Sequence, residues 1–209
     1  MIPAEWTELL DRLDAGSCSV PVYRELERRY LEPHRAYHNL QHIQHCINEF
    51  SAVRGQCPNP DAVELALWFH DAVYDPRAKD NEERSADLAS AFIRDAELGE
   101  TFDANVRRLI LATKHAAVPT ELDEQIIVDV DLAILGQAPE VFDTYEKNIR
   151  AEYAWVPEAE FRAGRSSILK KFLERPVIFS TPRFRERYEA AARANLQRSM
   201  AKLNVTLDG

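Results

Sequence analysis

The sequence predicts an all-α protein, and three observations support this prediction. Hydrophobic residues recur at the spacing of helix faces along nearly the whole chain. Proline residues stand at most joints between these periodic segments. Only 6 glycines occur among 209 residues, which argues against a fold with many tight β-turns. We therefore expect a helical bundle of about eight to ten helices, forming a single domain over residues 1–209 in which residues 139–209 are a candidate C-terminal extension.

The expected helices follow one another closely in sequence. Pro3 opens the first, and its apolar residues share one face of the helical wheel. The histidine-rich stretch from Tyr37 to Cys46 begins the third, which we expect to end near Val53. Gly136 is expected to cap a later helix at its C-terminus. The remaining helices are expected within residues 21–31, 61–75, 81–98, 102–115, 123–136, 140–156, 157–174 and 184–203.

Charge and composition limit the classes of function. The net charge of −9 argues against a broad surface that binds nucleic acid or an acidic membrane. A local basic pocket for a small anion is still compatible with this net charge. The cysteines Cys18, Cys46 and Cys57 form no C-x-x-C pair and are odd in number, which favours a reducing compartment. The N-terminus lacks the pattern of a signal peptide, and no apolar run approaches the ~20 residues that span a bilayer. We expect a cytoplasmic protein without a membrane or nucleic-acid partner.

Three of the six histidines lie in "YHNLQHIQHC", at His38, His42 and His45. On a helix that turns about 100° per residue, they fall opposite the apolar stripe formed by Leu40, Ile43, Ile47 and Phe50. Two interpretations remain open. The histidines line either a solvated face or a polar cavity inside the bundle, where His at i and i+4 would suit a metal ion.

Two further segments contain candidate metal ligands. His70 and Asp71 stand together at the end of an apolar run, where an uncompensated charge is costly to bury. Asp71 is also close to an expected helix C-terminus, which disfavours a carboxylate, and a bound cation would relieve both costs. Asp129 and Asp131 lie within another apolar helix, about 200° apart around its axis. They cannot both face one site, and the residues alone do not choose between them.

Taken in order, His42, His70-Asp71 and Asp131 resemble the motif of the HD superfamily of metal-dependent phosphohydrolases. More narrowly, "YHNLQHI", "FHDAVYD", "NEERSA" and "DVDLAILG" are similar to a bacterial family of predicted HD-type hydrolases. The resemblance extends over most of the chain, through "IRAEY", "AGR" and "ARANL". It implies an HD-type helical domain with His42, His70, Asp71 and Asp131 as metal ligands.

The resemblance also implies roles for neighbouring residues. "YHNLQH" resembles the Y-H-N-x-x-H segment of cyclic-nucleotide phosphodiesterases, in which the first histidine is a general acid, so His38 is the expected proton donor. Cys46 takes an aliphatic-like position one turn after His42, and His45 has no counterpart. Glu82 is the expected carboxylate that holds or activates metal-bound water; the alternative is a carboxylate that complements a helix dipole. No glutamine-bearing purine pocket follows His70-Asp71, so cyclic-nucleotide specificity does not carry over.

Two imidazoles and two carboxylates suit Mn, Fe, Co, Ni or Zn, and Mg at a second site stays open. An anionic substrate needs cationic partners. Lys114 and His115 are candidates for contacting phosphate or a second metal, with capping of a helix C-terminus as the alternative. Arg150 and Arg165, in the family-like segments, are candidates for binding it, with surface ion pairs as the alternative.

The predicted function is hydrolysis of a small phosphorylated, nucleotide-like metabolite, without a choice among phosphomonoesterase, phosphodiesterase and pyrophosphatase. The main alternative is a non-catalytic HD protein that binds a nucleotide or a metal in a regulatory role. A two-iron oxygenase would need more ligands, and a nucleic-acid-binding protein fits the charge poorly. A homodimer stays an open expectation.

Overall fold

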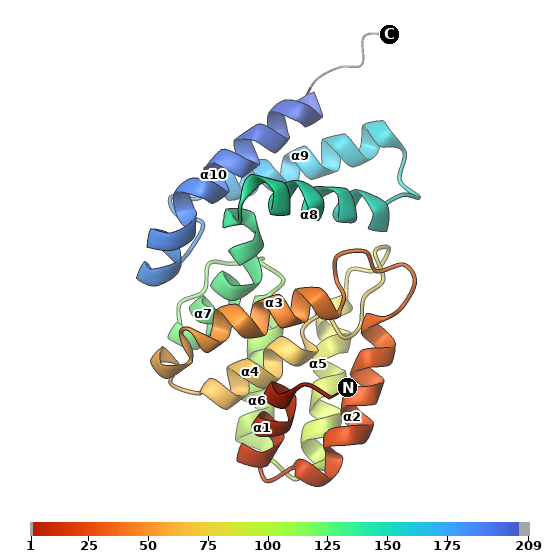
Figure 1. Cartoon of the computed structure of the whole chain (residues 1–209), viewed down its shortest axis with the longest axis vertical. Helices are drawn as coiled ribbons and strands as arrows, with labels where there is room; N and C mark the ends of the chain where they lie inside the picture. Colours follow the sequence, from red (N-terminus) through yellow and green to blue (C-terminus); the bar gives the residue numbers. More distant parts are fainter. Residues whose placement is uncertain (1, 205–209) are drawn as a thin grey trace. The chain divides into compact units, whose positions relative to one another are not determined.

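The computed structural model describes residues 2–204 and confirms the all-α prediction, since these residues contain helices and no strand. The α-helices are α1 (Ala4–Arg12), α2 (Ser19–Tyr30), α3 (Leu40–Ser51), α4 (Pro60–Phe69), α5 (Asn81–Asp95), α6 (Glu100–Ala112), α7 (Leu122–Leu132), α8 (Pro139–Glu152), α9 (Glu158–Glu174) and α10 (Pro182–Asn204) (Figure 1). Short 3-10 turns lie at Gly16–Cys18, Arg54–Gln56 and Ala133–Gly136.

The helices group into two compact units, Met1–Val130 and Asp131–Gly209. The division falls inside α7, earlier than residue 139, where the sequence suggested that a C-terminal extension begins. That the whole chain is one HD-type domain stays a prediction.

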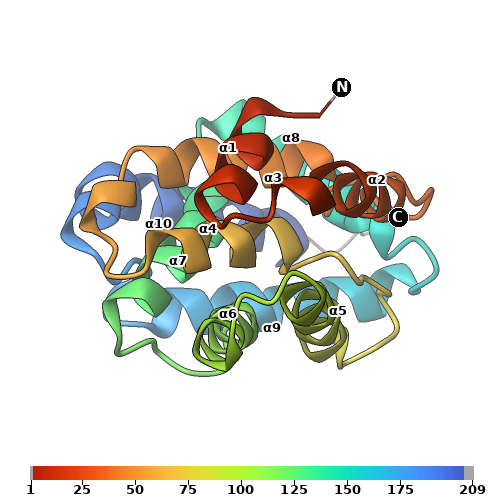
Figure 2. The same cartoon turned by 90° about the horizontal axis from the view of Figure 1, so that it is seen from below.

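The first unit is built around α4. Every residue from Ala62 to Phe69 is buried, so this helix has no solvated face. Trp6 of α1 packs edge-on against Trp68 with the ring centroids 5.5 Å apart, and the hydroxyl of Tyr30 donates to the Trp68 carbonyl oxygen over 2.9 Å. Helices α5 and α6 lie side by side, as the view from below shows (Figure 2). The contacts of Trp68 hold the C-terminal end of α4, which leads to His70.

Two helix ends differ from the sequence prediction. The helix α3 begins at Leu40, because the Asn39 side chain caps it: its Oδ1 accepts a hydrogen bond from the backbone N–H of Gln41 over 2.8 Å. His38 therefore precedes the helix, and placing it on the helical wheel was wrong. The helix α4 ends at Phe69, not near Asp75, so His70 is its C-cap and Asp71 lies just beyond.

In the second unit, Gly136 permits a close approach of two segments. A Cβ atom added to Gly136 would lie 2.5 Å from the Cβ of Tyr188 in α10. Gly99 is the one glycine in residues 2–204 with a positive φ, so Gly136 is not the left-handed C-cap that the sequence suggested. Asn195 adds two bonds to the same turn, since its side-chain amide donates to the carbonyl oxygens of Leu135 and Gln137, each over 2.9 Å.

Within residues 2–204, none of the helices combines the length and the apolar composition needed to cross a lipid bilayer.

Candidate metal centre

The first part of the site comes from α3. His42 and Cys46 lie one helical turn apart, and both are buried, with 3% and 0% of their surfaces exposed. The Sγ of Cys46 is 3.8 Å from each ring nitrogen of His42. The solvated-face interpretation is therefore wrong for His42, whereas His45 is only half-buried.

The C-terminus of α4 supplies a second imidazole. His70 Nδ1 lies 2.9 Å from the carbonyl oxygen of Leu67, and since a carbonyl only accepts, Nδ1 carries the proton. In the protonated ring the other nitrogen, Nε2, donates to Asp71. In the neutral ring Nε2 instead offers a lone pair, so a metal ion would bind there in place of that proton. This Nε2 lies 3.1 Å from the Nε2 of His42. The backbone of α4 thus selects the tautomer suited to a ligand.

Asp71 places a carboxylate against both rings. Its Oδ2 is 3.4 Å from Nε2 of His42 and 3.2 Å from Nε2 of His70. Burial by itself would raise the pKa of Asp71, but the neighbouring His70 and His38 and the hydrogen bonds from His42 and His70 hold it well below its usual value. Asp71 is therefore an ionised acceptor at neutral pH, despite its position after a helix C-terminus.

Asp131 of α7 completes the group. A carboxylate oxygen of Asp131, the Sγ of Cys46 and one ring nitrogen each of His42 and His70 all lie within 4.8 Å of one another. Asp131 directly follows Val130 in the same helix, and it is half-buried. Asp129 is fully buried and does not belong to this group. Of the four predicted ligands, the structure thus brings together His42, His70 and Asp131 and adds Cys46. Asp71 contacts both imidazoles but is not part of this group.

The donor set fits a metal ion. Ligand atoms about 2.1 Å from one ion must lie roughly 3.0–3.4 Å apart at right-angled or tetrahedral positions. The three atoms His42 Nε2, His70 Nε2 and Asp71 Oδ2 are separated by 3.1, 3.4 and 3.2 Å. Imidazole, carboxylate and thiolate donors together suit a borderline transition metal. The group of His42, Cys46, His70 and Asp131, whose ligand atoms lie within 4.8 Å of one another, could also hold a metal ion. These distances do not select the identity of the metal.

His38 lies beside this group on the segment before α3. Its ring stacks on Tyr74 with the centroids 4.2 Å apart, and its centroid is 6.0 Å from that of His42. The ring of Tyr37 also contacts His42, with the centroids 4.7 Å apart. His38 is half-buried, so its ring is fixed on one face and still reachable by a small molecule.

The remaining predicted residues divide into two sets, of which the first surrounds Lys114. The ammonium group of Lys114 pairs with Glu83, lies 3.8 Å from Glu82 and donates to the Lys79 carbonyl oxygen over 3.2 Å. His115 follows with a left-handed backbone at φ 54°. The structure therefore joins Glu82 to Lys114, and the roles predicted for these residues stay predictions.

The second set consists of two arginines of the Asp131–Gly209 unit. Arg150 donates to Glu158 and to the carbonyl oxygens of Tyr153 and Val156, contacts that close the C-terminus of α8. Arg165 is buried and pairs with Glu146, while it donates to the Tyr145 hydroxyl over 2.8 Å. Both guanidinium groups thus have intramolecular partners, which favours the ion-pair alternative, and binding of substrate by them stays a prediction.

Two residues near the site were missed by sequence reasoning. Cys46 carried a usable signal, because it follows His42 by one turn, but a cysteine in an apolar helix looks like a core residue. Arg35 carried no signal, since its contacts join segments that are far apart in sequence.

Comparison with known proteins adds no relative: no family model, no curated protein and no solved structure matches this chain.

Proposed function

We propose that the chain is a metal-dependent phosphohydrolase of the HD type that acts on a small phosphorylated, nucleotide-like metabolite. The observation that carries this proposal is the convergence of His42, His70 and Asp71, whose donor atoms have the mutual spacing of ligands on one ion. Asp131 and Cys46 each bring a ligand atom within 4.8 Å of ligand atoms of His42 and His70. The order of the motif along the chain supports the HD interpretation.

Each residue of the centre has a separate task in this proposal. His42, His70, Asp71 and Asp131 hold a divalent Mn, Fe, Co, Ni or Zn ion, with Cys46 as an additional donor. When bound, such an ion supplies an acidified water and polarises a phosphoryl oxygen. His38, fixed by its stacking on Tyr74, donates a proton to the leaving oxygen.

The substrate is expected to be small and anionic. The net charge of −9 disfavours a polyanion such as nucleic acid, and a cytoplasmic location fits the sequence. Lys114 is the cationic candidate for contacting phosphate, because its side chain is 30% exposed and its ammonium group lies near the Glu82 carboxylate. Binding of phosphate there would require the ammonium group to leave or share the Glu83 carboxylate.

Hydrolysis of a panel of phosphomonoesters, phosphodiesters and nucleoside polyphosphates tests the proposal, with each candidate metal added in turn. The products are separated by chromatography, because a phosphodiesterase would release a phosphomonoester and a pyrophosphohydrolase would release pyrophosphate. We expect turnover by the wild type that is lost in His42→Ala. His38→Ala should retain the metal and slow substrates with poor leaving groups more than those with good ones. A metal-loaded wild type that binds nucleotides but hydrolyses no member of the panel would contradict hydrolysis and favour a regulatory binding protein.

A further inference from the structure

Arg35 is buried next to the candidate metal centre. Its side chain is 0% exposed, although a guanidinium group is always charged at neutral pH. Glu32 neutralises the charge by accepting from Arg35 Nε over 3.0 Å. The terminal nitrogens of Arg35 donate to backbone carbonyl oxygens.

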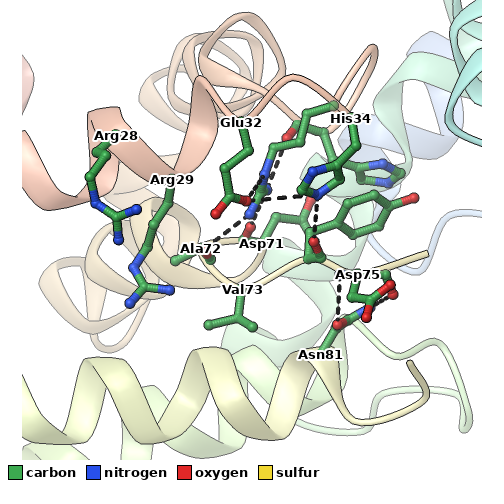
Figure 3. A network of polar contacts seen from close by, with 12 residues as sticks. Arg28, Arg29, Glu32, His34, Asp71, Ala72, Val73, Asp75 and Asn81 are labelled. Carbon is green, nitrogen blue, oxygen red and sulfur yellow. Dashed lines mark hydrogen bonds and ion pairs between the residues drawn. The ribbon is translucent and has the colours of Figure 1, made fainter. Parts of the chain in front are cut away.

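These carbonyls belong to the two segments that lead to the site. Arg35 Nη1 donates to the carbonyl oxygens of His38, over 3.0 Å, and of Asp71, over 2.6 Å. Arg35 Nη2 donates to the carbonyl oxygen of Ala72 over 3.1 Å. Figure 3 shows Glu32 facing Asp71 and Ala72 across these contacts (Figure 3). One side chain thus joins the segment before α3 to the turn after α4, where helical carbonyls lack partners within the helix.

Aromatic rings fix the plane of the guanidinium group. Its carbon lies 5.2 Å from the ring centroid of Tyr30 and 5.5 Å from that of Tyr74. Tyr74 in turn stacks on His38 and accepts at its carbonyl oxygen from His34 over 2.8 Å. Arg35 therefore holds the backbone of Asp71 by a direct hydrogen bond. It holds His38 in two ways, by a hydrogen bond to the His38 carbonyl oxygen and through Tyr74, which contacts both Arg35 and the His38 ring.

We propose that Arg35 is a positioning residue of the metal centre: it fixes the backbone at His38 and Asp71 so that the proton donor and the ligand carboxylate keep their places beside His42 and His70. This inference rests on the proposed metal site and deepens it. Lysine cannot replace Arg35, because a single ammonium group lacks the planar fork that reaches both segments at once. Residues that orient ligands typically change metal affinity by about 10–100-fold when they are substituted.

The chain offers a matched control in Arg193 of α10. Arg193 pairs with Glu189 and donates to the carbonyl oxygens of Leu173, Arg175 and Pro176. It therefore makes the same kind of contacts as Arg35, but none of these four partners is a candidate ligand or the proposed proton donor. Arg35→Lys and Arg193→Lys should both lower the melting temperature, and only the first should disturb the metal.

The experiment measures the dissociation constant of Zn²⁺ by competition with a chelator and the absorption spectrum of the Co²⁺ form, at a temperature where all variants are folded by circular dichroism. We expect Arg35→Lys to weaken Zn²⁺ binding by about 10-fold or more and to alter the Co²⁺ spectrum at saturation. Arg193→Lys should keep the wild-type constant and spectrum. Wild-type values in Arg35→Lys would overturn the inference and leave the metal site standing, whereas a wild type that binds neither ion would overturn both.

A second pair of variants serves if Arg35→Lys does not fold. Glu32→Gln removes the carboxylate that fixes Arg35 Nε and leaves the guanidinium group in place. Glu25→Gln removes a comparable ion pair of α2 with Arg28 and Arg29. We expect weaker Zn²⁺ binding in Glu32→Gln alone, and equal binding in the two variants would overturn the positioning role.

Discussion

Cys46 brings a sulfur atom to a group whose other donors are nitrogen and oxygen, and this bears on which metal binds. It is fully buried and lies one turn after His42, so the same helix face presents both donors. Thiolates favour Zn²⁺, Co²⁺ and iron over Mg²⁺ and Mn²⁺. A thiolate contribution would therefore narrow the range of metals that two imidazoles and two carboxylates alone would accept.

A substitution at Cys46 tests this contribution. We predict that the Co²⁺ form of the wild type has a near-ultraviolet band from charge transfer between thiolate and metal, and that Cys46→Ser lacks it. Cys57→Ser is the control, because Cys57 lies outside the group. An identical spectrum in Cys46→Ser would show that the sulfur is not bound.

Asp129 and Asp131 provide a comparison within one helix. Asp131 belongs to the metal-binding group, and Asp129 is 0% exposed and outside it. We predict that Asp131→Asn loses metal with little effect on unfolding of the metal-free protein. Asp129→Asn should retain metal and lower the free energy of unfolding by about 1–3 kcal/mol, since it weakens a buried acceptor. Metal analysis and urea titration of both variants check this, and the reverse pattern would exchange their roles.

At the level of elements, the turn Ala133–Gly136 depends on a close contact with α10. A methyl group at Gly136 would meet the Tyr188 Cβ at 2.5 Å and its carbonyl oxygen at 2.9 Å. We predict that Gly136→Ala lowers the free energy of unfolding by about 1–3 kcal/mol through overpacking. Gly164→Ala, within α9 and with open space around the new Cβ, should instead raise it by about 0.5–1 kcal/mol. Equal effects of the two substitutions would contradict this account of Gly136.

The helix α2 carries an acid-sensitive ion pair. The hydrogen bond from Arg28, with further contributions from Arg29, lowers the pKa of Glu25 to about 2. A carboxylate whose pKa is lower in the folded state stabilises the fold above the unfolded pKa of about 4.3, and this stabilisation disappears as pH falls towards about 2. We predict that Glu25→Gln is slightly less stable than the wild type at pH 7 and equally stable near pH 2, as measured by thermal melts. If the difference in melting temperature between Glu25→Gln and the wild type stayed constant from pH 7 to pH 2, the ion pair would not be the cause of that difference.

Some elements were predictable from sequence because their signals are local. The helices α8, α9 and α10 start near the expected residues, since Pro139, Pro157 and Pro182 mark those starts. The start of α3 was missed because the cap by Asn39 competes with a helical pattern that continues upstream. The contacts of Arg35 and the approach of Cys46 to His70 depend on tertiary packing, which periodicity does not report. A motif can name ligand candidates, but the residues that position them appear only once the chain is folded.

For the molecule as a whole, metal binding should couple to folding. Candidate ligands come from α3, the end of α4 and α7, so a bound ion links segments that are distant in sequence and favours the folded state. We predict that free Zn²⁺ at about 100 times its dissociation constant raises the free energy of unfolding by about 2.7 kcal/mol. Melts with and without Zn²⁺ should show this rise in the wild type and in Glu25→Gln, and not in His42→Ala. A wild type that melts identically with and without Zn²⁺ would contradict the coupling.

The central claim is that His42 binds a metal ion, and elemental analysis of the purified protein tests it most directly. Wild type, His42→Ala and His45→Ala should be compared after the same purification and after incubation with Mn²⁺, Fe²⁺ and Zn²⁺. His45 is the matched control, because it lies on the same helix, is half-buried and is outside the candidate group. We predict about one equivalent or more of a transition metal in the wild type and in His45→Ala, and its loss in His42→Ala. Equal metal content in all three proteins, or none in any of them, would contradict the metal centre and the hydrolase built on it.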